Sequence, residues 1–420
     1  MTWHQLTREW LLLRRQRVVW LGAPLVLLAG LLAIGNGHRV IERQREVLAE
    51  AEARQAAEHQ AILRPQASAV AGDQLYYLAF HTVRTPSPWA PLALGQRDVH
   101  AFNLKVRIHA LQGQLYDADL DNPLLTSFGT FDLAFVLVVI APLFLIALAW
   151  NLRSGDEEQG TLPLLRLQAP SVVRLYAIRL VLRTGVVWAT VLLLFGVSLP
   201  WLGLPVDQTL GRMVGVATLY LLGWSALAGL VATLRRPSEV NLLLLLGAWI
   251  VGTALGPAFV NVAAGRRYPL PEALELTVAQ RQGYHGAWDE PLADVMEAFY
   301  RRYPEWRTAV VPTDRYSNGW YYAMQQRGDD QARAVAQRYR EVMEAREVWS
   351  QSRLWWFPPA AVHARLNALA RTDQAAYLRY LDSVAAYHEA LKRHFFPVIF
   401  SEQRVSDVDW ALAPRHAHRD

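Results

Sequence analysis

Residues Phe131–Trp150 read FDLAFVLVVIAPLFLIALAW, and no residue from Leu133 to Trp150 carries a charge. A helix crosses the roughly 30 Å hydrocarbon core of a bilayer with about 20 apolar residues. This stretch therefore predicts a transmembrane helix. Working outward, four further stretches have the same length and character: Val18–Gly35, Leu182–Leu204, Met213–Leu234 and Val240–Val260.

The composition of the whole chain agrees with a membrane protein. Of 420 residues, 53% are hydrophobic and 19% are charged, whereas soluble proteins have about 45–50% and 25%. The absence of cysteine excludes disulfides, thiolate catalysis and cysteine-bound metals. A net charge of only +5, without a basic cluster, argues against nucleic acid as a partner.

The arginines predict how the chain crosses the membrane, because cytoplasmic flanks carry the excess of positive charge. They gather before the first stretch, between the second and third, and between the fourth and fifth. We therefore expect an interfacial helix and first span in 1–35, a first extracytoplasmic domain in 36–127 and a second span in 128–150. A cytoplasmic segment at 151–181, three spans in 182–264 and a second extracytoplasmic domain in 265–420 complete the order.

The two outer segments are predicted to be mainly helical. Polar residues with one apolar face run from His38 to Leu63, and Phe102–Ile108 alternates like a strand. In the second segment, turn signals that include Gly328 separate the predicted helices, which are Pro291–Tyr300, Asp329–Trp349, Ala360–Ala370 and Asp373–Phe396. Within the fifth span, Gly252, Gly256 and Pro257 predict a close helix contact or a kink. The fold class is an all-α polytopic membrane protein with about five transmembrane helices and two extracytoplasmic domains.

Motifs for catalysis are missing from the sequence. It contains no Gly-x-x-x-x-Gly-Lys-Ser/Thr phosphate loop, no His-Glu-x-x-His and no Gly-x-Ser-x-Gly. We expect no catalytic residue, no metal site and no cofactor in this chain; His416 and His418 form a pair that lacks further ligands. The carboxylate of Asp132, at the outer edge of the second span, either suits the positive end of its helix or forms an intramembrane polar site.

The segment after the second span carries the most specific motif. It reads Asp156-Glu157-Glu158-Gln159-Gly160-Thr161-Leu162, continues through Leu164-Leu165 and ends near Pro170. An acidic residue shortly before Gly-Thr-Leu in this position resembles the coupling segment of type-2 ABC-transporter permeases. Asn122-Pro123 and the start of the second span resemble the subgroup with large extracytoplasmic inserts, similar to gliding-motility and nitrous-oxide-reductase maturation permeases. Either Glu157 or Glu158 corresponds to the acidic residue of that family.

The resemblance implies a function and a set of partners. Glu157, Glu158, Gly160, Thr161 and Leu162 would contact an ABC ATPase subunit, which would hold the ATP and Mg²⁺. A second permease subunit, identical or a sister chain, would complete an exporter in the bacterial inner membrane, with the large domains in the periplasm. The alternative is mechanotransmission to a periplasmic or outer-membrane partner without conducted cargo. The family norm is six spans, so either a sixth is absent or the sequence ends before it.

Overall fold

The computed structural model describes residues 3–62, 70–115, 130–168, 171–270, 273–307 and 314–419. Asn122-Pro123 and Pro170 lie outside these residues. In the described part, the chain is almost entirely helical, and five helices are long and apolar enough to cross a membrane. This part of the predicted fold class is confirmed. The five are Arg17–Ala61, Leu133–Glu158, Val172–Leu202, Gln208–Thr233 and Ser238–Arg267.

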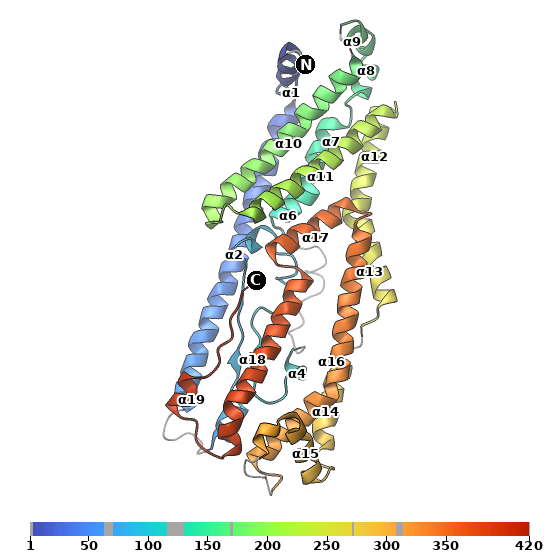
Figure 1. Cartoon of the computed structure of the whole chain (residues 1–420). Helices are drawn as coiled ribbons and strands as arrows, with labels where there is room; N and C mark the ends of the chain where they lie inside the picture. Colours follow the sequence, from blue (N-terminus) through green and yellow to red (C-terminus); the bar gives the residue numbers. More distant parts are fainter. Residues whose placement is uncertain are drawn as a thin grey trace.

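The five helices pack around one apolar core near one end of an elongated molecule (Figure 1). The second span lies at the centre of this core and is interrupted by a π-helical turn. It consists of α6 (Leu133–Phe135), η2 (Val136–Ile140) and α7 (Ala141–Ala149). Around it lie α2 (Arg17–Ile62), α10 (Val172–Leu202), α11 (Gln208–Thr233) and the last span, which is α12 (Ser238–Ile250), η3 (Val251–Leu255) and α13 (Gly256–Arg267).

Helix α2 joins the first predicted span and the polar run after it into a single helix of 46 residues. At 1.5 Å per residue its length is about 69 Å. It extends past the span core and along the rest of the molecule (Figure 1). Near its middle it touches the 3₁₀ helix η1 (Ala90–Leu92), where a Cβ on Gly37 would lie 1.9 Å from the carbonyl oxygen of Pro91. Only glycine allows this approach.

Both predicted outer segments contribute to one hydrophobic core rather than to two. We call this part the distal region; it comprises residues 70–115 and 268–419 as described above. Phe80 and Val106 from the first segment are buried together with Tyr380 and Phe396 from the second. The region also contains two short strand pairs. Strands β1 (Phe80–His81) and β3 (Lys105–Val106) pair antiparallel within the first segment, and β2 (Arg84–Thr85) pairs parallel with β4 (His418–Arg419) of the second segment.

The described residues of the distal region form α3 (Ala71–Tyr76), α4 (Gln112–Leu115), α14 (Ala273–Gly286), α15 (Leu292–Arg302), η4 (Pro304–Trp306), α16 (Asn318–Leu354), α17 (Pro358–Ala370), α18 (Gln374–Phe400) and α19 (Asp407–Ala411). Of these, α15, α17 and α18 lie close to predicted helices, and α16 begins well before its predicted start at Asp329. The other helices were not predicted. The turn predicted at Gly328 is wrong. This glycine lies within α16, where its missing side chain lets the helix approach Gln280 and Gly283 of α14. Gly328 therefore indicates a close contact between α16 and α14 and not a turn.

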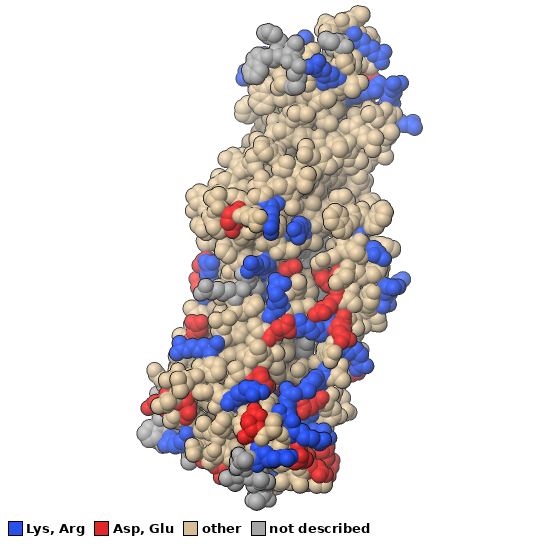
Figure 2. Space-filling view, in the orientation of Figure 1, with Lys and Arg blue, Asp and Glu red and all other residues tan. Residues whose placement is uncertain are grey.

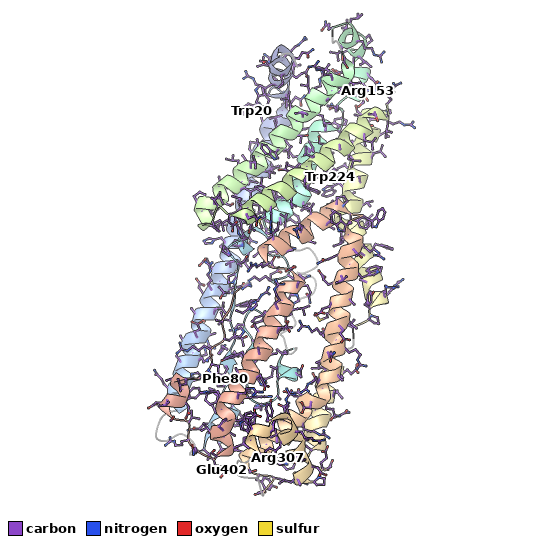
Figure 3. The ribbon with its side chains drawn as sticks, in the orientation of Figure 1. Trp20, Phe80, Arg153, Trp224, Arg307 and Glu402 are labelled. Atoms are coloured by element: carbon purple, nitrogen blue, oxygen red, sulfur yellow. The ribbon has the colours of Figure 1, made fainter. Side chains whose placement is uncertain are left out.

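The distal region meets the spans at α17. A Cβ on Gly256 would lie 2.1 Å from the ring of Phe357, and one on Gly252 would lie 2.8 Å from Pro359. The predicted close approach at these glycines is therefore present, and its partner is the start of α17. Arg153 and Arg307 lie at opposite ends of the molecule (Figure 3). Figure 2 shows a belt without charged residues over α10 and α11, between a basic end and the charged distal region.

Candidate functional site

The predicted coupling segment forms a small helical hairpin, which we call the α8–α9 hairpin. It consists of α8 (Ser154–Glu158), α9 (Leu162–Gln168) and the turn between them. It lies at the end of the molecule farthest from α15, the same end as the N-terminal helix α1 (Trp3–Leu13) (Figure 1). Gly160 supplies the turn: its φ is +67° and no atom lies within 4 Å of an added Cβ. Glycine is required there by conformation and not by space.

Asp156 connects the hairpin to the third span and to α1. Its carboxylate accepts hydrogen bonds from the hydroxyl of Tyr176 at 3.1 Å and from the guanidinium of Arg179, both on α10. Arg179 also donates through Nε to Glu9 of α1 at 2.8 Å. Glu9 is buried, so α1 is held to α10 by a shielded ion pair. One arginine thus joins three elements at this end.

Glu158 connects the hairpin to the last span. Its two oxygens accept hydrogen bonds from the backbone N–H of Ser238, at 2.7 Å, and from the Ser238 hydroxyl, at 2.9 Å. Ser238 is the first residue of α12, so the carboxylate lies at the positive end of that helix. Beneath this contact, the hydroxyl of Ser154 lies 2.7 Å from that of Ser238 and accepts from Asn241 at 3.2 Å.

The remaining predicted residues of the turn make local contacts. Glu157 forms an ion pair at 2.9 Å with Arg153, four residues earlier. Thr161 donates its hydroxyl to the side chain and to the backbone carbonyl of Asp156, at 3.2 and 3.3 Å. These contacts shape the hairpin itself. Glu158, rather than Glu157, is the predicted carboxylate that reaches another span.

The apolar residues of α9 are arranged differently from our expectation. Leu162, which we expected to contact an ATPase subunit, is only 7% exposed and is buried by the chain itself. The hairpin and its neighbours therefore leave little of this side chain for a partner to contact. Leu164 and Leu167 are 58% and 85% exposed on the same short helix. They are the apolar side chains that the hairpin offers to a partner.

Asp132 has a structural position at the start of α6. It is the N-cap residue, and its side chain accepts a hydrogen bond from the backbone N–H of Phe135 at 2.8 Å. Its other oxygen accepts from the N–H of Leu94 at 2.7 Å, which links the second span to the loop after η1. The side chain is 1% exposed. Of the two interpretations, this geometry fits the first-turn role.

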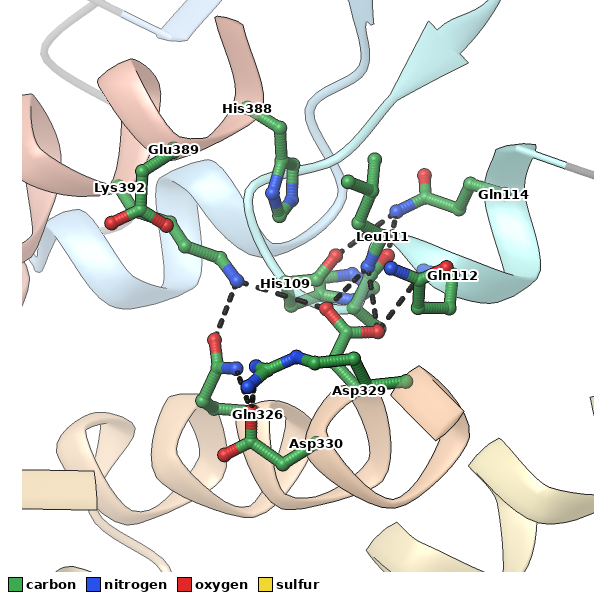
Figure 4. A network of polar contacts seen from close by, with 12 residues as sticks. His109, Leu111, Gln112, Gln114, Gln326, Asp329, Asp330, His388, Glu389 and Lys392 are labelled. Carbon is green, nitrogen blue, oxygen red and sulfur yellow. Dashed lines mark hydrogen bonds and ion pairs between the residues drawn. The ribbon is translucent and has the colours of Figure 1, made fainter. Parts of the chain in front are cut away.

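A second network of charges is buried in the distal region (Figure 4). The carboxylate of Asp329 accepts hydrogen bonds from the backbone N–H groups of Leu111 and Gln112, at 2.7–3.0 Å. Lys392 donates to Gln326 at 2.6 Å and lies 3.7 Å from Asp329. Burial lowers the pKa of Lys392, and the Asp329 carboxylate opposes that shift. The network holds the first outer segment to α16 and α18.

The buried histidines beside this network are neutral. His388 lies 3.0 Å from the carbonyl oxygen of Arg107, and His109 lies 3.0 Å from that of Tyr76. Burial lowers the pKa of His109 to about 4 and that of His388 well below its ordinary value. His416 lies 3.0 Å from both the Val83 amide and the Ser383 hydroxyl, so both ring nitrogens have partners. In the described residues no three His, Asp or Glu side chains form a group suited to a metal ion.

Sequence reasoning missed several residues of the hairpin end. Asp156 was recognised as acidic but not as the central contact, and Arg179, Glu9 and Ser238 were not selected. A signal existed for two of them. Tyr176 and Arg179 are three residues apart and share one helix face, and Ser238 follows Pro237 at the start of an apolar run, where helices begin. The pairing with Glu9, 170 positions away in the chain, has no local signal.

Comparison with known proteins adds one match. Residues 274–419 match a family model described as "Domain of unknown function (DUF3526)". The match covers α14 to β4, which is the second of the two segments of the distal region. Neither a curated protein nor a solved structure matches the chain.

Proposed function

We propose that this chain is the permease subunit of a bacterial ABC transporter of the exporter type, driven by a separate ATPase subunit that docks on the α8–α9 hairpin. One observation carries the proposal. The hairpin presents Leu164 and Leu167 outward while its carboxylates are bonded to α10 and α12. A partner that moves the exposed leucines would therefore pull on two spans through charged contacts.

In this proposal the hairpin transmits motion and performs no chemistry. ATP and Mg²⁺ belong to the ATPase, because the sequence has no phosphate loop. Arg179 and Glu158 connect the hairpin with α1, α10 and α12. An ATPase that binds the hairpin differently in its ATP-bound and ATP-free states would shift the spans between two arrangements.

The proposal also includes a location and further subunits. The chain would lie in the bacterial inner membrane, with the α8–α9 hairpin in the cytoplasm and the distal region in the periplasm. The arginines at the hairpin end and the uncharged belt of Figure 2 support this orientation. A second permease subunit, identical or a sister chain, would pair with it.

Mechanotransmission is the second candidate, and one observation favours it. Helix α2 continues without interruption from the spans into the distal region, where Ile41, Leu48 and Ala51 are buried. A continuous helix can carry a displacement to a periplasmic partner without a pore. Stimulation of ATP hydrolysis by cargo would favour transport, whereas stimulation only by a periplasmic or outer-membrane protein would favour mechanotransmission.

The docking proposal is tested by Leu164→Asp combined with Leu167→Asp. The chain is coexpressed with an ABC ATPase subunit taken from a neighbouring reading frame, and their association is measured by copurification. Loss of anchor contacts costs about 2 kcal/mol or more, which is about 30-fold in affinity. The matched control is Leu412→Asp, an equally exposed leucine of the distal region. Copurification of the double variant at the level of the control would overturn the proposal.

A further inference from the structure

A cavity of about 660 Å³ lies between the spans and the distal region. One wall is formed by the second and last spans, through η2, η3 and α13, and the other by α16 and α17. Both π-helical turns of the spans border this space. Such turns are found frequently at functional sites, and nothing in the proposed ATPase contact accounts for a cavity here.

The two walls differ in chemistry. The wall made by the spans is mainly apolar, with Thr253 and Asn261 as polar members beside Phe135, Val138, Val139, Pro257 and Val260. The wall made by the distal region carries the polar groups Arg346, Glu347, His363 and Asn367. A molecule that fits both walls has an apolar part toward the spans and a polar part toward the distal region.

The polar groups of this cavity are incompletely satisfied. The Oδ1 atom of Asn367 is buried and has no hydrogen-bond partner, and His363 makes no hydrogen bond to a described residue. Leaving a buried polar atom unpaired costs about 1–3 kcal/mol. Native proteins rarely accept this cost. The cavity is therefore better explained with a polar ligand inside it.

The cavity also contains one positive and one negative side chain that do not pair with other charges. Arg346 donates to the side-chain oxygen of Asn261 at 3.0 Å, and Glu347 accepts from Gln351 at 2.7 Å. Among the described residues neither forms an ion pair. A guanidinium binds phosphate well, and a carboxylate binds an ammonium group. The two neighbours therefore suit a ligand head that carries both charges.

A second, mainly apolar cavity of about 1010 Å³ adjoins the first. The two share Leu354, Pro359 and Ala364, and the second is otherwise lined mainly by α11, by α17 and by the turn before α17. Trp355 and Trp356 in this turn are 81% and 80% exposed. Tryptophan concentrates at the level of lipid headgroups, and α11 belongs to the uncharged belt of Figure 2. The apolar cavity is thus placed to receive hydrocarbon chains.

We propose that the two cavities together bind one phospholipid with a zwitterionic phosphate–amine headgroup. The phosphate lies at Arg346, the amine at Glu347 and the acyl chains along α11. Drug-sized ligands occupy cavities of about 300–1,000 Å³, so the first cavity holds the headgroup and the second takes part of the tails. The inference requires that the chain lies in a membrane, but it does not depend on an ATPase.

The test is native mass spectrometry of the full chain, purified in detergent, stripped of lipid and then supplied with phosphatidylethanolamine. One lipid is expected to remain bound per chain. Arg346→Gln is expected to weaken binding at least tenfold, and Ala364→Phe, which fills space shared by both cavities, is expected to do the same. The control is Arg353→Gln, seven residues later on α16 and outside both cavities. An equal unfolding midpoint for the three variants shows that each is folded.

Two further arms decide the class of ligand. Phosphatidylglycerol, which lacks the amine, is expected to bind at least tenfold more weakly to the parent, and Glu347→Gln is expected to reduce that preference. Equal binding of the two lipids would overturn the zwitterionic headgroup. Retention of inorganic phosphate as tightly as lipid, or equal loss in Arg346→Gln and Arg353→Gln, would overturn the lipid site itself.

Discussion

At the α8–α9 hairpin three consecutive carboxylates each contact a different partner, whereas in the distal region the single carboxylate of Asp329 accepts hydrogen bonds from three donors. Asp156 bonds to α10, Glu157 to Arg153 and Glu158 to α12. Asp329 accepts from two backbone amides and Gln280, with Lys392 nearby, all shielded from water. The contacts of the hairpin are separate, so one of them can break while the others remain. The hydrogen bonds to Asp329 share one buried carboxylate, so its movement would break all of them together. The hairpin end is thus suited to movement and the distal region to holding its shape.

The largest effect is expected from Asp329→Ala. It leaves the amides of Leu111 and Gln112 without an acceptor and Lys392 without its nearest carboxylate. Removing one partner of a buried charged pair costs about 3–5 kcal/mol. We expect a large fall in the unfolding midpoint and early proteolysis of the distal region. Asp330→Ala is the control, because the neighbouring carboxylate is more exposed and pairs with Arg333, and such pairs contribute about 1 kcal/mol or less.

A smaller but still large effect is expected from Leu162→Asp, which tests whether the hairpin has a core of its own. The substitution places a charge where a buried leucine packs, and loss of such a side chain costs about 2–5 kcal/mol when it is fully buried. We expect a lower unfolding midpoint and loss of ATPase association together. Leu167→Asp should lose the association with an unchanged midpoint. If both variants behave alike, Leu162 and Leu167 do not have the separate roles described here.

Leu162 and Leu167 also show which features of this molecule could be predicted from the sequence and which could not. The spans were predictable because a bilayer demands a long uncharged run. The sequence did not indicate which leucines of α9 are exposed, since burial within a seven-residue helix depends on which neighbour covers each side chain. The joint core of the two outer segments was not predictable either. The Asp329 carboxylate accepts a hydrogen bond from Leu111, which is more than two hundred residues away in the sequence, and a local sequence pattern cannot predict a contact at that separation.

A moderate effect is expected from acidification, and it should act on the distal region. Because burial lowers the pKa of His109 to about 4, the folded chain binds fewer protons than the unfolded chain between pH 6.5 and 4. The contribution of His109 to the free energy of unfolding is therefore fully present above pH 6.5, and it is lost as the pH falls from 6.5 to 4. At pH 5.5 the loss from His109 is about 1.4 kcal/mol. Arg107 and Lys392, which face this histidine, oppose its protonation.

The measurement is the unfolding midpoint of the full chain at pH 7.5 and 5.5. His109→Gln retains a donor for the Tyr76 carbonyl and removes the titrating group, so its midpoint should fall less than that of the parent. His285→Gln, at an exposed position on α14, should behave as the parent does. An equal fall for His109→Gln and the parent would mean that His109 does not contribute to the acid sensitivity.

The smallest change in stability, with the most informative functional result, is expected from Glu158→Gln. The variant keeps an oxygen that can accept from Ser238 but loses the charge at the N-terminus of α12. A charge in such a position contributes about 0.3–1 kcal/mol, so the unfolding midpoint should shift little. If the hairpin moves the last span through this contact, stimulation of the ATPase by the permease should fall well beyond what that shift explains. Glu157→Gln, which breaks only the ion pair within the hairpin, should leave stimulation near the parent level. Equal stimulation in the two variants would place the link between hairpin and spans elsewhere, with the Asp156–Arg179 contact as the remaining candidate.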